Sequence, residues 1–256
     1  FNLYRDDLDI NLSTETYEDL NRLESDRYEY IFPSLNITKN IKDFDKGNLS
    51  LETSGTSRLF NTNIYEKKIV NDLSYKSFNR INALGLVSNY EILLKNFNAD
   101  SKRSTTYKNK AETSLQSIFN YEMKYPLQKI NENFLSTLTP TMSLRYSPDQ
   151  SKNRSKDDRE IDVNNIFSIN RIGSSDTVEG GQSITIGNEY SLYDSNDNNR
   201  KILSIDLATA FRDEKNDKLP INSTLGDKQS NVFGSIEFNT KKFVDFNYNF
   251  SLDNDF

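Results

Sequence analysis

The sequence NNIFSINRIGSSDTVEGGQSITIGNEYSLYD, residues 164–194, contains a change of pattern that decides the fold. Its second half alternates as an extended strand does, because successive side chains of a strand point to opposite faces. One face receives Ile184, Ile186, Tyr190 and Leu192, and the other receives Thr185, Gly187, Glu189 and Ser191. An apolar face opposite a polar, charged face is typical of a sheet that separates two different solvents.

The first half of the same stretch is polar and interrupted by glycines. We expect Arg171 and Asp176 to form an ion pair within it. Such a pair has two interpretations: it contacts a substrate or gates a channel, or it fixes a loop folded against the sheet. We favour the second, with Gly173, Gly180 and Gly181 allowing tight backbone turns.

Comparable alternation recurs along the chain and predicts about eleven strands, each roughly ten residues long with aromatic residues near its ends. The last is the most regular: Val244, Phe246, Tyr248, Phe250 and Leu252 alternate with polar residues. Pro33 predicts a strand end, an edge or a bulge, because proline cannot donate a ladder hydrogen bond. Residues 13–25 would also fit a helix, although strand and loop suit their neighbours better.

The composition favours a wide β-barrel over disorder. Hydrophobic residues make up only 34% of the 256 residues, which is low for a globular domain of this size. However, 16 phenylalanines, 14 tyrosines and a net charge of only −6 are unlike a disordered chain. In a barrel with a polar interior, only one face of each strand must be apolar.

Several classes of function are disfavoured. The chain has no cysteine and no histidine, so it lacks the usual ligands of transition metals and the commonest general base. Carboxylates such as Asp157, Asp158 and Glu160 lie in the hydrophilic run of residues 149–160, which we expect to be a solvated loop. We therefore predict no enzyme activity, no catalytic or metal-binding residues and no cofactor. The mildly acidic charge also argues against a nucleic-acid partner.

Strand length distinguishes a membrane barrel from a soluble sandwich, whose strands average five or six residues. Eleven strands are an odd number for a bacterial barrel, and an open sheet would leave unpaired edges in lipid. We therefore predict an all-β fold in which residues 1–256 form part of a larger antiparallel transmembrane barrel, about 11–12 long strands of it.

Beyond these patterns, residues 164–194 resemble a motif of the LptD family, the outer-membrane lipopolysaccharide-assembly proteins also called organic solvent tolerance proteins. The matching positions are Asn165, Phe167, Ser168, Asn170, Arg171, Gly173, Asp176, Gly180, Gly181 and Gly187. Three further segments are similar in the same order: residues 27–35 with Tyr30 and Pro33, residues 92–100 with Lys95, and residues 138–148 with Pro140 and Arg145.

The resemblance implies an outer-membrane barrel of about 26 strands, of which this chain is a piece lacking the periplasmic N-terminal jellyroll and some strands. It implies that lipopolysaccharide arrives from a periplasmic Lpt protein bridge and leaves through a lateral seam into the outer leaflet. It also implies an LptE-like lipoprotein as a plug. Two other functions remain open: a general porin or receptor barrel, and a soluble carbohydrate-binding β protein.

Overall fold

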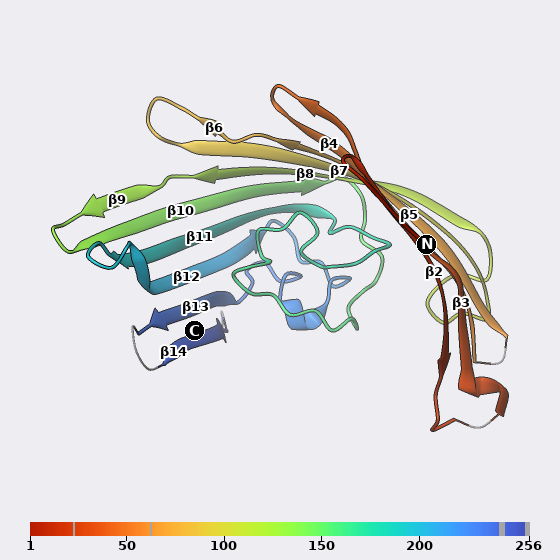
Figure 1. The fold of residues 1–256 in the computed structure, drawn as a ribbon. Coiled ribbons are helices and arrows are strands. Elements are labelled where there is room, and N and C mark those ends of the chain that lie inside the picture. Colours follow the sequence, from red (N-terminus) through yellow and green to blue (C-terminus); the bar gives the residue numbers. More distant parts are fainter. Residues whose placement is uncertain (23, 62, 241–243, 254–256) are drawn as a thin grey trace. The chain divides into compact units, whose positions relative to one another are not determined.

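The computed structural model describes residues 1–22, 24–61, 63–240 and 244–253. Within this part of the chain the secondary structure is almost entirely β (Figure 1). The strands are β1 (Asn2–Arg5), β2 (Leu8–Glu18), β3 (Tyr28–Phe44), β4 (Gly47–Phe60), β5 (Ile64–Ser77), β6 (Arg80–Ile81), β7 (Val87–Lys102), β8 (Glu112–Lys124), β9 (Leu127–Ile130), β10 (Phe134–Ser147), β11 (Gly181–Asp194), β12 (Arg200–Arg212), β13 (Val232–Asn239) and β14 (Asp245–Leu252). Two 3-10 turns, η1 (Glu24–Arg27) and η2 (Ile221–Ser223), complete the elements.

The strands form one sheet in the order β1-β2-β3-β4-β5-β7-β8-β10-β11-β12-β13-β14, with β6 beside β7 and β9 beside β10. Over the described residues the sheet does not close. The predicted all-β, antiparallel architecture is confirmed, and eleven of the strands have eight or more residues. Residues 13–18 belong to β2, so the strand interpretation was right for this part of the possible helix. Among the described residues no helix is long and apolar enough to cross a membrane.

The chain divides into two compact units. Unit 1 contains Phe1–Ser77, Ile92–Ser117 and Ser175–Thr177, and unit 2 contains Phe78–Glu91, Ile118–Ser174 and Val178–Phe256. In each unit one face of the sheet is covered by loop residues and the other is not. We call these the covered face and the open face.

In unit 2 the alternation predicted for β11 is confirmed. Ile184 and Ile186 lie on the open face and are 42% and 49% exposed, whereas Ser183 and Thr185 on the covered face are 5% and 3% exposed. Antiparallel pairing extends both faces across the neighbouring strands, because directly opposed residues lie on the same face of the sheet. Thr185, for example, lies opposite Ser143 of β10 and Ala210 of β12.

The covered face of unit 2 is less uniformly polar than the sequence suggested. A hydrophobic core joins the strand residues Ala208, Ala210 and Phe233 to loop residues, which include Ile166, Ile172, Leu219 and Leu225. The connection between β12 and β13 therefore contributes buried leucines to this core. These residues do not alternate, so strand periodicity could not reveal them.

The covered face of unit 1 has a smaller core, in which Val70, Phe97 and Ala99 pack with Tyr107 of the β7–β8 connection. Beside it in the sequence, Lys95 is only 1% exposed and binds Asp72 at 2.7 Å. Its ammonium group also donates to the carbonyl oxygen of Ser175 at 3.3 Å. Loop residues are thus attached to the covered face here too.

The prolines lie where strand pairing is interrupted. Of the three alternatives for Pro33, a strand end, an edge or a bulge, the structure agrees best with the last, because Pro33 falls within the register shift between Ile31 and Ser34. Pro140 follows the four residues of β10 that pair with β9 and precedes the six that pair with β8. Since proline has no backbone N–H, both positions need one hydrogen bond fewer.

Replacing Ile186 by arginine tests whether the open face contacts hydrocarbon. We expect Ile186→Arg to destabilise the protein in a bilayer by about 2–4 kcal/mol, the cost of a cation on a lipid-facing barrel position near the midplane. The measurement is the fraction of full-length protein that folds into lipid vesicles, read from heat-modifiable gel migration. Glu189→Arg, on the covered face, is the control and should fold normally; equal folding of both variants would contradict a lipid-facing assignment.

Candidate functional site

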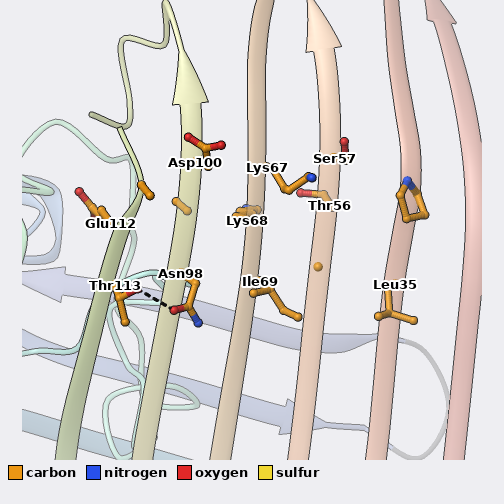
Figure 2. A pocket seen from close by; sticks show the side chains of 14 residues that line it. Leu35, Thr56, Ser57, Lys67, Lys68, Ile69, Asn98, Asp100, Glu112 and Thr113 are labelled. Carbon is orange, nitrogen blue, oxygen red and sulfur yellow. Dashed lines mark hydrogen bonds between the residues drawn. The ribbon is translucent and has the colours of Figure 1, made fainter. Parts of the chain in front are cut away.

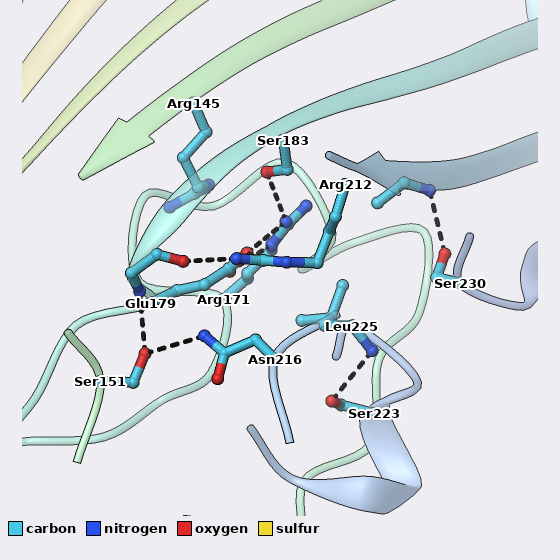
Figure 3. Close-up of polar contacts among 12 residues, drawn as sticks. Arg145, Ser151, Arg171, Glu179, Ser183, Arg212, Asn216, Ser223, Leu225 and Ser230 are labelled. Carbon is cyan, nitrogen blue, oxygen red and sulfur yellow. Dashed lines mark hydrogen bonds and ion pairs between the residues drawn. The ribbon is translucent and has the colours of Figure 1, made fainter. Parts of the chain in front are cut away.

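A buried arginine–glutamate pair fixes the loop between β10 and β11 to the sheet (Figure 3). The side chain of Arg171 is 0% exposed and that of Glu179 is 2% exposed. Arg171 donates from Nε and Nη2 to the two carboxylate oxygens of Glu179, each at 2.6 Å. This two-pronged geometry is the strongest form of an arginine–carboxylate contact, because two charge-assisted hydrogen bonds act in parallel.

Arg171 also reaches strand β11. Its Nη1 donates to Thr185 Oγ1 and its Nη2 donates to Ser183 Oγ, both at 2.8 Å. These two hydroxyls lie on the same face because they are two residues apart in a strand. The alternation of β11 therefore supplies the surface on which the loop is anchored.

Two further arginines come from the neighbouring strands. Arg212, the last residue of β12, binds the Glu179 carboxylate and donates to the carbonyl oxygen of Gly180. Arg145 of β10 donates to the carbonyl oxygens of Ser168 and Ile169 in the loop. Figure 3 shows these side chains converging from separate strands on one short piece of loop.

The charge balance of this cluster is unusual, because one buried carboxylate serves three buried arginines. Burial on its own raises the pKa of Glu179, but the charges of Arg171, Arg145 and Arg212 and the hydrogen bonds from Arg171 outweigh it. They lower the pKa from 4.5 to about 2. Glu179 is therefore ionised at neutral pH, and removing its charge would leave the buried arginines without compensation.

Two glycines allow the loop to enter β11 at this point. A Cβ on Gly180 would lie 2.1 Å from the backbone oxygen of Asp149, so no larger residue fits without moving the chain. The backbone N–H of Gly180 donates to Ser151 Oγ at 2.8 Å. Gly181 has φ +87°, a left-handed conformation that residues with a side chain rarely adopt.

The ion pair predicted between Arg171 and Asp176 was wrong in its partner. Arg171 binds Glu179, the residue immediately before the two glycines, whereas Asp176 is buried but groups with unit 1. The spacing of residues along a loop does not determine which carboxylate forms an ion pair with a given arginine. Glu179 and Arg212 were not singled out from the sequence, although a charged residue preceding a Gly-Gly entry to a strand was a usable signal.

The other predicted motif residues have local structural positions. The Phe167 ring lies against Gly187, where a Cβ would come within 2.8 Å of it. Asn165 Oδ1 accepts from the Asp162 backbone N–H at 3.1 Å, and Asn170 Nδ2 donates to the Ser174 carbonyl oxygen at 3.0 Å. Gly173 has φ +67°. Tyr30 and Pro33 lie in β3 of unit 1, and Pro140 lies in β10.

A polar cavity of about 430 Å³ lies beside the Phe167 ring in unit 2. Its charged lining residues are Glu122, Lys124, Glu189, Lys201, Asp206 and Glu237. Lysine charges meet carboxylates within it, at 3.1 Å for Lys124 with Glu122 and 3.6 Å for Lys201 with Glu237. In the described part of the chain no group of three or more histidine, cysteine, aspartate or glutamate residues could hold a metal ion. The cavity instead presents carboxylates, amides and hydroxyls beside an aromatic ring, a combination suited to hydrogen bonding with sugars.

Comparison with known proteins agrees with this picture. A family model described as LptD, LPS transport system D, matches residues 2–256. No curated protein matches the chain.

Removing the charge of Glu179 tests the role of the arginine cluster. We expect Glu179→Gln to destabilise the attachment of the loop by about 3–5 kcal/mol, because it leaves buried cations uncompensated. The measurement is the rate of proteolytic cleavage in the loop of the folded full-length protein. The control is Asp157→Asn, an exposed loop carboxylate 3.8 Å from Arg154, which should change stability by no more than about 1 kcal/mol. Similar cleavage of Glu179→Gln and the wild type would show that the cluster does not hold the loop.

The lowered pKa of Glu179 predicts that the attachment of the loop to the sheet depends on pH. Because the pKa of Glu179 is lowered in the folded protein, its contribution is complete above pH 4.5, the ordinary value, and is lost as the pH falls to about 2. We expect the backbone amides of residues 165–181 to lose protection from hydrogen exchange across this window, measured relative to the exchange of unprotected amides at the same pH. Glu179→Gln should remove this pH dependence of the protection, and wild-type protection that stays constant across the window would refute the assignment.

Proposed function

The chain belongs to the LptD family of outer-membrane proteins, and from this premise we propose that its covered face lines the path taken by the sugar portion of lipopolysaccharide. The function of the family is the transport and assembly of lipopolysaccharide into the outer membrane. The chain is accordingly a transport protein and not an enzyme.

The polar cavity beside Phe167 is the observation that carries this proposal. Lipopolysaccharide combines a large polar sugar portion with several acyl chains, so a transporter must offer each part a suitable surface. Among the charged side chains of the cavity, four carboxylates outnumber two lysines. Such a surface favours weak hydrogen bonds to sugar hydroxyls over tight binding of anions, which suits passage more than retention.

The open face supports the complementary half of the proposal. Its exposed isoleucines, leucines and aromatic residues present hydrocarbon to the bilayer, where the acyl chains of the lipid remain. We propose that residues 1–256 form part of the wall of a larger barrel, together with strands that pair with β1 and β14. An open edge would otherwise leave backbone N–H and C=O groups unpaired in lipid.

The family membership further supports specific partners. In this proposal an N-terminal jellyroll receives lipopolysaccharide from the periplasmic Lpt bridge, and an LptE-like lipoprotein plugs the barrel of about 26 strands. Release occurs into the outer leaflet through a lateral seam between the first and last strands. In this proposal the loops on the covered face of unit 2, which belong to the chain that forms the barrel wall, narrow the interior of the barrel.

Reversing charge in the cavity tests the proposal. We expect Glu189→Lys in the full-length protein to slow surface delivery of lipopolysaccharide roughly fivefold, the effect of about 1 kcal/mol, because an added cation would retain anionic sugars. Delivery is measured by surface labelling of newly made lipopolysaccharide in cells with equal amounts of folded protein. Asp217→Lys, at a loop residue whose side chain is 84% exposed, is the control.

Unchanged delivery by Glu189→Lys would place the sugar path elsewhere. Steady ion conductance through the purified protein, together with normal delivery of lipopolysaccharide in its absence, would instead support a porin.

A further inference from the structure

The connection between β7 and β8 is strongly basic, although the chain as a whole carries a net charge of −6. Residues 102–110 read KRSTTYKNK and contain no aspartate or glutamate. Their cationic side chains are all exposed: Lys102, Arg103, Lys108 and Lys110. A surface on which one sign of charge is concentrated raises the local concentration of ions of the opposite sign, so this connection attracts anions.

The connection is folded over the covered face of unit 1. The Tyr107 ring lies 5.7 Å from the Phe97 ring, between ring centroids, and packs against the small core that Phe97 forms with Val70. Ser104 donates to the carboxylate of Glu66, which shares the covered face with Val70 because the two residues are four apart in β5. The exposed cations are therefore attached to the face that we propose as the sugar path.

Local hydrogen bonds fix the conformation of the connection. Ser101 Oγ donates to the carbonyl oxygen of Lys108 at 2.7 Å, and the backbone N–H groups of Thr106 and Tyr107 donate to Ser104 Oγ, each at 3.0 Å. Arg103 has φ +60°, a left-handed conformation that is uncommon for arginine. Such conformations persist where surrounding contacts fix them. A ligand that binds these cations therefore has little ordering of the backbone to offset.

The carboxylates that contact the connection do not balance its charge. Glu66 accepts from Ser104, and Glu112 Oε2 lies 3.9 Å from Lys108 Nζ. The Lys108 side chain is 72% exposed, so this ion pair is screened by solvent and weak. The four cations of residues 102–110 thus exceed the two carboxylates, and an anion is the chemical partner that this surface fits.

The open face of unit 1 has no comparable excess of charge among its described groove residues. A groove of about 430 Å³ lies there, with a largely apolar lining that includes Leu35, Gly55 and Ile69 (Figure 2). Its charged lining residues balance, since there are two lysines and two carboxylates: Lys67, Lys68, Asp100 and Glu112. The positive charge of the β7–β8 connection therefore belongs to the covered face and not to the face that we assign to lipid.

We propose that the β7–β8 connection binds the phosphate groups of the sugar portion of lipopolysaccharide. A phosphate group carries up to two negative charges and three acceptor oxygens, so it can contact several of these cations at once. The inference rests on the proposed function, which places the sugar path on the covered face. It adds a second kind of contact, because the acidic cavity of unit 2 suits sugar hydroxyls whereas this connection selects phosphorylated sugars.

Removing three of the charges tests the proposal. We expect the full-length protein with Lys102→Gln, Arg103→Gln and Lys110→Gln to bind fully deacylated lipopolysaccharide, which keeps its phosphorylated sugars, roughly tenfold more weakly, because three charge contacts are lost. The affinity is measured by calorimetric titration of the folded protein in detergent micelles. The same oligosaccharide without its phosphates should bind both proteins equally weakly.

A control variant removes the same charge from exposed lysines elsewhere. Lys46→Gln, Lys129→Gln and Lys156→Gln together should leave the affinity for the phosphorylated oligosaccharide within about twofold of the wild type. Equal affinities of the loop variant and this control would overturn the proposal. The wild type provides an independent measurement: its preference for the phosphorylated form should disappear in about 1 M salt. A preference that persists there would also overturn the proposal.

Two further titrations identify the source of the phosphate. Wild-type protein in nanodiscs that contain phosphatidylglycerol should bind the oligosaccharide as it does in micelles. Loss of binding in the nanodiscs would show that lipid head groups occupy the cations, and it would overturn the proposal. Displacement of the oligosaccharide by an equal concentration of inorganic phosphate would overturn it too, because the site would then bind an isolated ion.

The outcome is distinguishable from that of the delivery test. Loss of the phosphate preference alongside slowed delivery by Glu189→Lys would overturn the phosphate site alone. A retained preference with unchanged delivery by Glu189→Lys would support the phosphate site and reject the cavity of unit 2 as part of the sugar path.

Discussion

Every backbone N–H and C=O group placed in hydrocarbon must find a partner within the protein, and the architecture of this chain follows from that constraint. Long antiparallel strands satisfy it, since each interior strand bonds to both neighbours along its length. Once the strands are in place, their two-residue period separates side chains into two faces, and the open face receives the exposed isoleucines and leucines, such as Ile184, Ile186 and Leu94. Pro33 and Pro140 are consistent with this constraint, because each falls where the hydrogen-bond ladder is shifted or changes its partner strand.

The covered face depends on a different kind of interaction. Besides the hydrophobic core that Ile166, Leu219 and Leu225 make with the sheet, its loops are attached through charge. Glu179 and Arg171 of the loop are held by Arg212 of β12 and by the Ser183 and Thr185 hydroxyls of β11, respectively. Arg145 of β10 binds the loop backbone, so three adjacent strands meet a single loop segment. In unit 1 the buried Lys95 makes a comparable attachment to Ser175. Buried ions are expensive to desolvate, and their use here favours a fixed loop position over maximal stability.

The two cavities show how one sheet can offer two chemistries. The cavity beside Phe167 is lined by carboxylates and lysines because covered-face positions alternate with apolar ones. In unit 1, a groove lined by Leu35, Gly55 and Ile69 of the open face is largely apolar.

The alternation of Ile184, Thr185 and Ile186 was sufficient to predict strands, faces and an antiparallel sheet, because a strand's side-chain period is a local property of the backbone. The ordered motif residues were sufficient to indicate the family. The sequence also placed Arg171 in a loop folded against the sheet. These features depend only on residues that are close together in the sequence.

Only the tertiary structure decided which groups meet across the chain. The structure shows that the partner of Arg171 is Glu179 and not Asp176, and that Arg212 binds the same carboxylate. It also shows that Leu219 and Leu225 are buried in a core with Phe233. It also placed Gly55 between Leu35 and Ile69 to leave a groove. These outcomes depend on strand register and on the path of long loops, which are set by contacts between residues far apart in sequence and not by any local period.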